Sequence, residues 1–226
     1  MSDLLPDDVR LMFRGFLHEI RNPMSAVLTA TALLRDPSAL PDDEVTNLLE
    51  MVDGETRHIN RIINEFDHYL HLQQPVMEPF DLAAAVRNVL AELRREQLLD
   101  GKIEVIDELP RAQQAHGDGV QISEALRAIL LNALQALEGS AQTPLQIQLS
   151  LQTHPGQIAL LVQDNGEGFH GECLQRAFEP FYSTRPGACG LGLPLAQAIA
   201  HQHQGSLEII PPSSQPGACL RMTFLQ

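Results

Sequence analysis

The chain has 226 residues, of which 44% are hydrophobic and 19% charged, a composition that is typical of globular proteins and excludes disorder and collagen. At roughly 150 residues per domain, the length accommodates one large domain or two small ones. Acidic residues outnumber basic residues 29 to 15, and the net charge of −14 argues against nucleic acid or an anionic membrane as a partner.

The first third of the chain predicts two helices. Apolar residues recur at helical spacing from about Pro6 to Gln74. Asp36–Ser38 and Pro41–Glu44 interrupt this pattern and place acidic residues at the start of the second helix, where the helix dipole favours them. The segment therefore predicts an antiparallel helical hairpin.

Each predicted helix carries one apolar stripe. The stripes comprise Leu17, Ile20, Met24, Val27, Thr31 and Leu34 in the first helix, and Val45, Leu48, Val52, Thr56, Ile59, Ile63, Phe66 and Leu70 in the second. Leu49, Ile62 and Tyr69 widen the second stripe beyond what one hairpin can bury. We therefore expect a second hairpin as partner, which gives a homodimer built on a four-helix bundle.

Pro75 and Pro79 end the helical pattern, so we place a domain boundary after residue 74. Residues 75–226 mix helical and strand periods, which predicts an α+β domain with an antiparallel-rich sheet covered by helices. We predict helices from a cap at Asp81 to about Leu98, from a cap at Ser123 to Leu137, and over 195–203, and strands over 102–109, 145–152, 157–163, 206–210 and 218–224. The two strands around His154-Pro155-Gly156 form a β-hairpin.

The first candidate site is the sequence Phe16–Pro23 in the first helix. With the apolar stripe in the seam, His18, Glu19 and Asn22 face outward, and Asn22 lies one turn beyond His18. A neutral imidazole is a nucleophile at pH 7, and a neighbouring carboxylate can accept the proton that leaves as the ring attacks phosphorus. Pro23 costs about 3 kcal/mol inside a helix, which indicates a useful bend beside His18. Taken alone, an exposed His-Glu pair is an ordinary surface feature.

Asn132 lies among leucines in the second predicted helix of the α+β domain. A buried amide needs partners, and its oxygen can bind a metal ion. An amide satisfied by other protein groups is the ordinary alternative.

The sequence Asp164–Phe169 follows the apolar strand Ile158–Val162. Its Asp-Asn-Gly is common in ordinary turns. Gly168, however, permits close approach of the backbone to a ligand, and the Asp164 carboxylate can accept a hydrogen bond from an exocyclic amine such as that of adenine.

The last motif runs from Phe178 to Arg185 and continues through Gly187–Leu193 into a helix. Glycines at a helix entrance expose N–H groups that bind phosphate. The motif is not a Walker A loop, since no Gly-Lys-Ser/Thr follows, and not a dinucleotide fingerprint, since a third glycine is missing and Pro194 takes the next position.

The three cysteines, Cys173, Cys189 and Cys219, are widely spaced and form no CxxC pair, which indicates a reducing compartment rather than a disulfide framework or a zinc site. No apolar run approaches the roughly 20 residues that span a bilayer, and the sequence Met1–Arg10 does not resemble a signal peptide. We therefore expect a cytoplasmic protein without direct membrane insertion.

In this order and spacing, the four motifs resemble those of the sensor histidine kinases of two-component signalling, over nearly the whole chain. The similarity identifies His18–Pro23 as the H box, Asn132 as the N box, Asp164–Gly168 as the first glycine box, Phe178–Phe181 as the F box and Gly190–Gly192 as the second glycine box. It implies a dimerisation and histidine phosphotransfer domain over residues 1–74 and a Bergerat-type (GHKL) ATP-binding sandwich over 75–226.

The resemblance also implies a role for each matching residue. His18 is the phospho-acceptor, Glu19 its base, and Asn22 the residue that positions water for dephosphorylation of a partner. Asn132 holds Mg2+ and Asp164 reads adenine. The remaining cofactor-binding residues, which shape the ATP pocket and its lid, are Asn165, Gly166, Gly168, Phe178, Phe181, Arg185, Gly190, Leu191 and Gly192.

The implied activity is ATP-dependent autophosphorylation of His18, then transfer to an aspartate of a response regulator receiver domain, with regulator phosphatase activity as an addition. Two residues depart from the family pattern: Ala128 stands where many relatives carry a polar residue, and Gln135 where many carry a basic one. A glutamine at position 135 resembles the pattern of the nitrogen-regulation subgroup of these kinases. Both departures put ATP affinity and the transfer rate in question.

Two other functions remain open. The chain is a phosphotransfer adaptor if the nucleotide domain is a relic, and an ATPase or protein kinase, as in anti-sigma factors, if the nucleotide fold serves another reaction. Only 17 residues precede His18, so the input signal is expected from an upstream sensor protein, the short N-terminus or a part of the protein outside this chain. His68, His71, His201 and His203 are interpreted as structural or surface residues, since no third ligand accompanies the first two at metal spacing.

Overall fold

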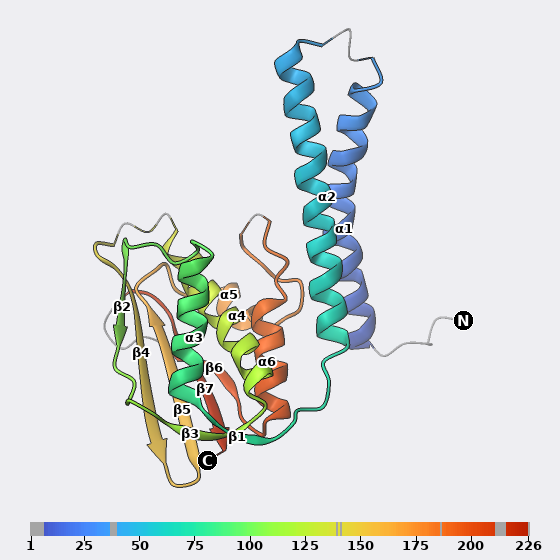
Figure 1. The fold of residues 1–226 in the computed structure, drawn as a ribbon. Helices are drawn as coiled ribbons and strands as arrows, with labels where there is room; N and C mark the ends of the chain where they lie inside the picture. The colour runs from blue at the N-terminus through green and yellow to red at the C-terminus, as the bar shows by residue number, and fades with distance from the viewer. Residues whose placement is uncertain are drawn as a thin grey trace. The chain divides into compact units, whose positions relative to one another are not determined.

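The computed structural model describes residues 7–36, 40–138, 140, 142–185, 187–210 and 216–225 (Figure 1). The chain forms two compact units. The first comprises Met1–Leu72 and Glu179–Leu191, and the second comprises Gln73–Phe178 and Gly192–Gln226. The motif between Phe178 and Gly192 thus belongs to the unit that contains the helical hairpin.

The first unit is built on the predicted hairpin of helices α1 (Asp7–Leu33) and α2 (Asp42–Leu70) (Figure 1). Helix α1 continues through Pro23, and α2 begins with Asp42, Asp43 and Glu44 in its first turn. These acidic residues are stabilising because the N-terminal end of a helix carries partial positive charge.

The single apolar stripe predicted for each helix divides in the structure. In α1, Ile20 and Val27 are partly buried, whereas Leu17 and Met24 are 56% and 47% exposed. In α2, Ile62 is fully buried while Ile63 is 43% exposed, so the packing seam passes through Ile62 and not through Ile63 as predicted. The prediction was wrong because one neighbouring helix covers only part of a broad apolar stripe.

The second unit is the predicted α+β sandwich. Its five-stranded sheet has the order β2-β4-β5-β7-β6, in which only β2 and β4 are parallel. The strands are β2 (Ile103–Asp107), β4 (Leu145–His154), β5 (Gln157–Asp164), β6 (Leu207–Ile210) and β7 (Cys219–Leu225). Helices α3 (Leu82–Arg95), α4 (Gly119–Leu137) and α6 (Gly192–Gln202) cover one face (Figure 1). Buried side chains of α4 and β5 such as Ile129, Leu130 and Leu160 fill the core between the layers.

Several predicted details are confirmed and others corrected. The β4–β5 hairpin pairs His154 with Gln157, and Asp81 caps α3 by accepting a hydrogen bond from the Ala84 N–H. The cap of α4 is Asp118 and not Ser123, whose hydroxyl instead donates to the Gly119 carbonyl inside the helix. The sequence also missed β1 (Glu78–Asp81) with its partner β3 (Gln114–Gly117), and the short α5 (Glu172–Arg176).

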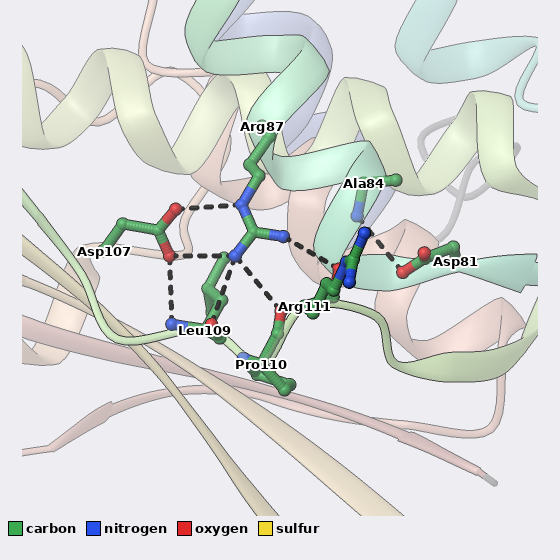
Figure 2. Close-up of polar contacts among 7 residues, drawn as sticks. All are labelled: Asp81, Ala84, Arg87, Asp107, Leu109, Pro110 and Arg111. Atoms are coloured by element: carbon green, nitrogen blue, oxygen red, sulfur yellow. Dashed lines mark hydrogen bonds and ion pairs between the residues drawn. The ribbon is translucent and has the colours of Figure 1, made fainter.

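Arg87 on α3 holds the loop that follows β2 (Figure 2). Its guanidinium forms two hydrogen bonds with the Asp107 carboxylate, at 2.9 and 3.3 Å, and donates to the carbonyl oxygens of Leu109, Pro110 and Arg111 at 3.1 to 3.2 Å. The hydrogen bond from Arg87 holds the pKa of Asp107 below its usual value. These contacts of one side chain fix the loop against α3, together with the backbone hydrogen bond from the Leu82 N–H to the Gln113 carbonyl oxygen at 2.8 Å.

Replacing Arg87 with Ala is expected to lower the Tm by several degrees at pH 7, because three carbonyl groups and one carboxylate lose their donor. The deficit should shrink as the pH falls below the ordinary Asp pKa of about 3.9, since a carboxylate with a lowered folded-state pKa stabilises the fold only while it is ionised. Thermal melts between pH 7 and pH 3 measure both effects. Arg95→Ala is the control, because Arg95 only approaches the exposed Glu92 at 3.8 Å. Equal Tm values for the two variants would contradict the assignment.

Candidate functional site

His18 lies on the exposed side of α1, where its side chain is 69% exposed. Its Nδ1 lies 3.5 Å from Oε1 of Glu19, whose side chain is only 26% exposed. Asn22, one turn further along, is exposed. The outward position predicted for Glu19 is only partly realised, since its side chain is much less exposed than that of His18. An exposed imidazole beside a carboxylate can act as a nucleophile whose proton has an acceptor.

The segment Glu179–Leu191 packs on the two helices. The Phe181 ring lies with its centroid 5.4 Å from that of Phe66 and 6.1 Å from that of Phe16. Cys189 and Leu191 are 5% and 3% exposed and share a cluster with Ile62 and Phe66. Arg185 shapes the turn in this segment, since its N–H donates to the Ser183 hydroxyl at 3.1 Å.

Asp164 ends β5 inside the second unit and is 4% exposed. Its Oδ1 accepts hydrogen bonds from the N–H groups of Gly166 at 2.8 Å and Ala218 at 3.3 Å. A buried carboxylate fixed by backbone donors is held in one orientation, which suits the recognition of an amine.

The glycines after Asp164 are required by contacts between backbone segments. A Cβ on Gly166 would lie 2.3 Å from the Ala136 carbonyl oxygen of α4. Gly168 has a φ of +73°, and a Cβ there would lie 2.4 Å from the Gly217 carbonyl oxygen. Both residues therefore hold the loop against α4 and the start of β7 in a way that no other residue type permits.

Asn165 ties the same loop to the start of β4. Its Oδ1 accepts from the Gln146 N–H and its Nδ2 donates to the Pro144 carbonyl oxygen, both at 2.8 Å. The Asn165 side chain, which the sequence predicted to bind cofactor, thus holds the loop in position.

Asn132 lies on α4 and is half-buried. None of the described residues hydrogen-bonds to its side-chain amide, so its oxygen is available to an added ligand. Ala128, one turn earlier, lies beside the first residue of α6, since a Cβ on Gly192 would be 3.7 Å from the Ala128 Cβ. Gln135 is exposed on the same helix.

The two glycines of the last motif differ in their surroundings. Gly190 has a φ of +69°, and a Cβ there would lie 2.6 Å from the Tyr182 carbonyl oxygen. Gly192 begins α6 and has room for a Cβ. Phe178, at the end of the preceding stretch of the second unit, is partly buried. Gly190 is therefore needed for the backbone path, whereas Gly192 is exposed where a helix presents free N–H groups.

Asp118 and His203 form a further polar centre that the sequence did not predict as a unit. The Asp118 N–H donates to Nε2 of the buried His203 at 2.9 Å, and Nδ1 of His203 lies 2.8 Å from the Ile199 carbonyl oxygen, to which it donates as the protonated nitrogen. Asp118 also accepts from the N–H of Val76 at 3.0 Å, and Gln121 donates to the Gln73 carbonyl oxygen at 2.9 Å. Burial raises the pKa of Asp118, but hydrogen bonds from backbone N–H groups lower it by a larger amount. The pKa of Asp118 therefore lies below its usual value.

Side-chain clusters offer no protein-built metal cage. No group of three or more His, Cys, Asp and Glu residues gathers at metal-binding distance in the described ranges. The Asn132 amide oxygen fits an ion that takes its other ligands from phosphate and water, as Mg2+ does at nucleotide sites. Among the helices described, none is both long and apolar enough to cross a bilayer.

Comparison with known protein families assigns both units. Residues 8–75 match the His Kinase A (phospho-acceptor) domain, and residues 117–226 match the histidine kinase-, DNA gyrase B- and HSP90-like ATPase family. The chain therefore joins a phospho-acceptor hairpin to an ATPase-type domain. It belongs to the sensor histidine kinases, as the motifs indicated.

Curated relatives include proteins of nitrogen regulation. The chain is 33% identical to the sensory histidine kinase/phosphatase NtrB of Klebsiella oxytoca, over 92% of this chain and 59% of the relative. It is 29% identical to the histidine-protein kinase AtoS of Escherichia coli, over 95% of this chain and 34% of the relative. The chain thus spans from about a third to about three fifths of the length of these relatives.

Solved structures share the fold. The crystal structure of histidine kinase ThkA in complex with the response regulator protein TrrA superposes with a TM-score of 0.73 at 19% identity, covering 95% of this chain and 60% of that one. The Acinetobacter baumannii histidine kinase AdeS gives a TM-score of 0.67 at 21% identity, covering 92% of this chain and 97% of that one.

Proposed function

We propose that the chain transfers the γ-phosphoryl group of ATP to His18 and then to an aspartate of a response regulator receiver domain. The observation that carries this proposal is the exposed His18 imidazole, 3.5 Å from the Glu19 carboxylate, in a chain that also contains an ATPase-type domain. ThkA, a structural relative, forms a complex with a response regulator, which supports the choice of partner. The domains we propose are a dimerisation and phosphotransfer domain over residues 1–74 and an ATP-binding domain over 75–226.

Each residue of the hairpin site has one task in this reaction. The imidazole of His18 attacks phosphorus, and Glu19 orients the ring and takes the proton that the other nitrogen releases. Phosphoryl transfer of this kind depends mainly on positioning and on neutralisation of charge. The exposure of His18 leaves room both for ATP and for the receiver domain.

The second unit supplies the nucleotide site in this proposal. Asp164 accepts the adenine amine, the Asn132 oxygen would hold Mg2+, and the free N–H groups at Gly192, the first residue of α6, bind the phosphates. Bound Mg2+ neutralises phosphate charge during transfer. Asn165 supports the adenine loop through its contacts with β4.

The experiment that tests the proposal is incubation of the protein with γ-labelled ATP and Mg2+, followed by acid and alkali treatment. Label on histidine is lost in acid and retained in alkali. A chain that neither incorporates label nor hydrolyses ATP fits the phosphotransfer adaptor instead, and a chain that hydrolyses ATP without incorporating label fits an ATPase on the same fold.

We further propose a homodimer in the cytoplasm. An outer apolar face, made of Leu17, Met24, Leu28, Leu49, Ile63 and Leu70, is 43% to 63% exposed on the single hairpin. Its members are separated by seven residues (Leu17 to Met24, Ile63 to Leu70), by fourteen (Leu49 to Ile63) or by four (Met24 to Leu28), spacings that keep them on one face as in a helical bundle seam. The free cysteines support a reducing compartment.

Regulator phosphatase activity is the second proposed function, favoured by the exposed Asn22 one turn from His18 and by the kinase/phosphatase NtrB among the relatives. Asn22→Ala is expected to retain autophosphorylation but to slow dephosphorylation of the cognate regulator, because the amide no longer orients a water molecule. Decay of a labelled regulator measures this loss, with Asn64→Ala on the exposed side of α2 as control. Equal decay with wild type and Asn22→Ala leaves Asn22 only a role beside Pro23.

A further inference from the structure

His203 joins the end of one helix of the second unit to the beginning of another. It follows the last residue of α6 and is 1% exposed, and its Nε2 accepts the N–H of Asp118, the cap of α4, at 2.9 Å. Its Nδ1 donates to the Ile199 carbonyl oxygen, 2.8 Å away, so Nε2 is the unprotonated nitrogen. The ring is therefore held by one hydrogen bond to the cap of α4 and one to α6.

Gly117, directly before this cap, leaves the space that the ring occupies. A Cβ on Gly117 would lie 2.8 Å from the Cδ2 of His203 and 2.7 Å from the Cδ1 of Ile122. The Ile122 methyl group can turn away by a change of rotamer, whereas the imidazole is fixed by its two hydrogen bonds. A side chain at position 117 therefore displaces the His203 ring.

The contact at His203 matches the position of α6 along α4. The two helices lie side by side (Figure 1). At about 1.5 Å per residue, the rise from Asp118 to Ala128 is about 15 Å, and the rise from His203 back to Gly192 is about 16 Å. A Cβ on Gly192 would lie 3.7 Å from the Ala128 Cβ, so the two equal spans also meet at their other ends. The helices are therefore antiparallel, and the hydrogen bond at one end sets which residue of α4 lies beside the start of α6.

The side chains that α4 and α6 bury are largely aliphatic. Ala125 and Ile129 of α4, and Ala196 and Ala200 of α6, are all fully buried. Hydrophobic contact holds helices together without a preferred direction, whereas a hydrogen bond requires its donor to point at its acceptor. The hydrogen bond between Asp118 and His203 therefore supplies a direction that the aliphatic contacts do not.

The opposite ends of the two helices carry groups of the proposed nucleotide site. Asn132 lies one turn beyond Ala128 on α4, and α6 begins at Gly192 with N–H groups that have no partner within the helix. In the proposed function, the Asn132 oxygen would hold Mg2+ and these N–H groups bind phosphate. A displacement of α6 along α4 changes the distance between these groups, while Asp164 on β5 keeps its position.

We propose that His203 is a positioning residue of the nucleotide site, which acts from about 16 Å away by fixing α6 on α4 so that the N–H groups at Gly192 reach the phosphates. Without the His203 contact, α6 loses its fixed position and phosphate binding weakens, whereas adenine recognition by Asp164 is unchanged. This inference rests on the proposed function in that the second unit binds ATP through Asp164, Asn132 and Gly192.

Equilibrium binding of two ligands to the full chain tests this role. Adenosine carries the base without phosphates, and AMPPNP with Mg2+ carries both. His203→Leu keeps a side chain of similar size but removes the acceptor for the Asp118 N–H. It should lower the AMPPNP affinity at least about tenfold, the equivalent of one hydrogen bond to a charged group, and leave the adenosine affinity unchanged.

Three further variants complete the experiment. His203→Gln restores an acceptor at about the reach of Nε2 and should recover most of the lost AMPPNP affinity. Gly117→Ala displaces the ring without removing it and should also weaken AMPPNP binding alone, which provides a second variant if His203→Leu does not fold. His201→Leu, the same substitution at an exposed position of α6, should change neither affinity. Circular dichroism shows which variants are folded.

The outcomes distinguish this role from the proposed function. Wild type that binds neither ligand contradicts the proposed function and the role of His203 with it. Wild type that binds both ligands, with the same ratio of affinities in folded His203→Leu and Gly117→Ala, overturns the positioning role alone. A loss confined to AMPPNP, with recovery in His203→Gln, supports it.

Discussion

His18→Gln is expected to abolish incorporation of phosphate from γ-labelled ATP. Glutamine keeps the size and polarity of the side chain but provides no nucleophilic nitrogen, so the covalent step has no acceptor. The exposure of His18 indicates that the substitution leaves the hairpin folded, because exposed positions away from special features change stability little. Nucleotide affinity should stay close to wild type, since Asp164 and Asn132 lie in the other unit.

The matched control is His68→Gln, which removes another exposed histidine from the hairpin. Autoradiography of both variants, together with a nucleotide-binding measurement, gives the comparison. Glu19→Gln should retain the acceptor but label slowly, because the ring nitrogen loses its neighbouring proton acceptor. Full labelling of His18→Gln would place the phosphoryl group elsewhere and overturn the assignment.

Leu28→Glu is expected to convert the dimer to a monomer at micromolar concentration. Leu28 is 63% exposed on the single hairpin, so a charge there is tolerated by the monomer. In a four-helix bundle the same position is buried, and an unpaired buried charge costs several kcal/mol. Analytical ultracentrifugation of the full chain measures the change, and circular dichroism shows whether the helices persist.

Two further substitutions serve as controls for Leu28→Glu. Thr29→Glu places the same charge on the next residue, about 100° around the helix, and should leave the dimer intact. Ile62→Glu, at a position that is fully buried within one hairpin, should unfold the hairpin itself. A monomeric wild type, or a dimeric Leu28→Glu, would show that the outer apolar face does not mediate self-association.

Local patterns predicted most of the elements correctly. The helical hairpin followed from apolar spacing over 60 and more residues, and the β4–β5 hairpin from alternation on both sides of His154-Pro155-Gly156. Asp81 was predicted as a cap because it stands directly before an apolar helical pattern. Each of these features depends on residues that are neighbours in the sequence.

The features that sequence missed depend on residues far apart. Asp118, which caps α4 in place of the predicted Ser123, also donates its N–H to His203, 85 residues later, and local sequence patterns do not report that contact. The packing of Phe181 on Phe16 and Phe66 joins the two ends of the motif series, and no periodicity reports such a contact.

The backbone contacts of the loop Asp164–Phe169 limit how the proposed base specificity can change. Gly166 and Gly168 touch carbonyl groups of α4 and of Gly217, so the main chain around Asp164 has a single available path. A variant library that seeks a different base preference should therefore hold these glycines constant and vary the side chains next to Asp164 and Asn132. Selection experiments on this domain would then yield substitutions around Asp164 and Asn132, while the glycine positions return only glycine.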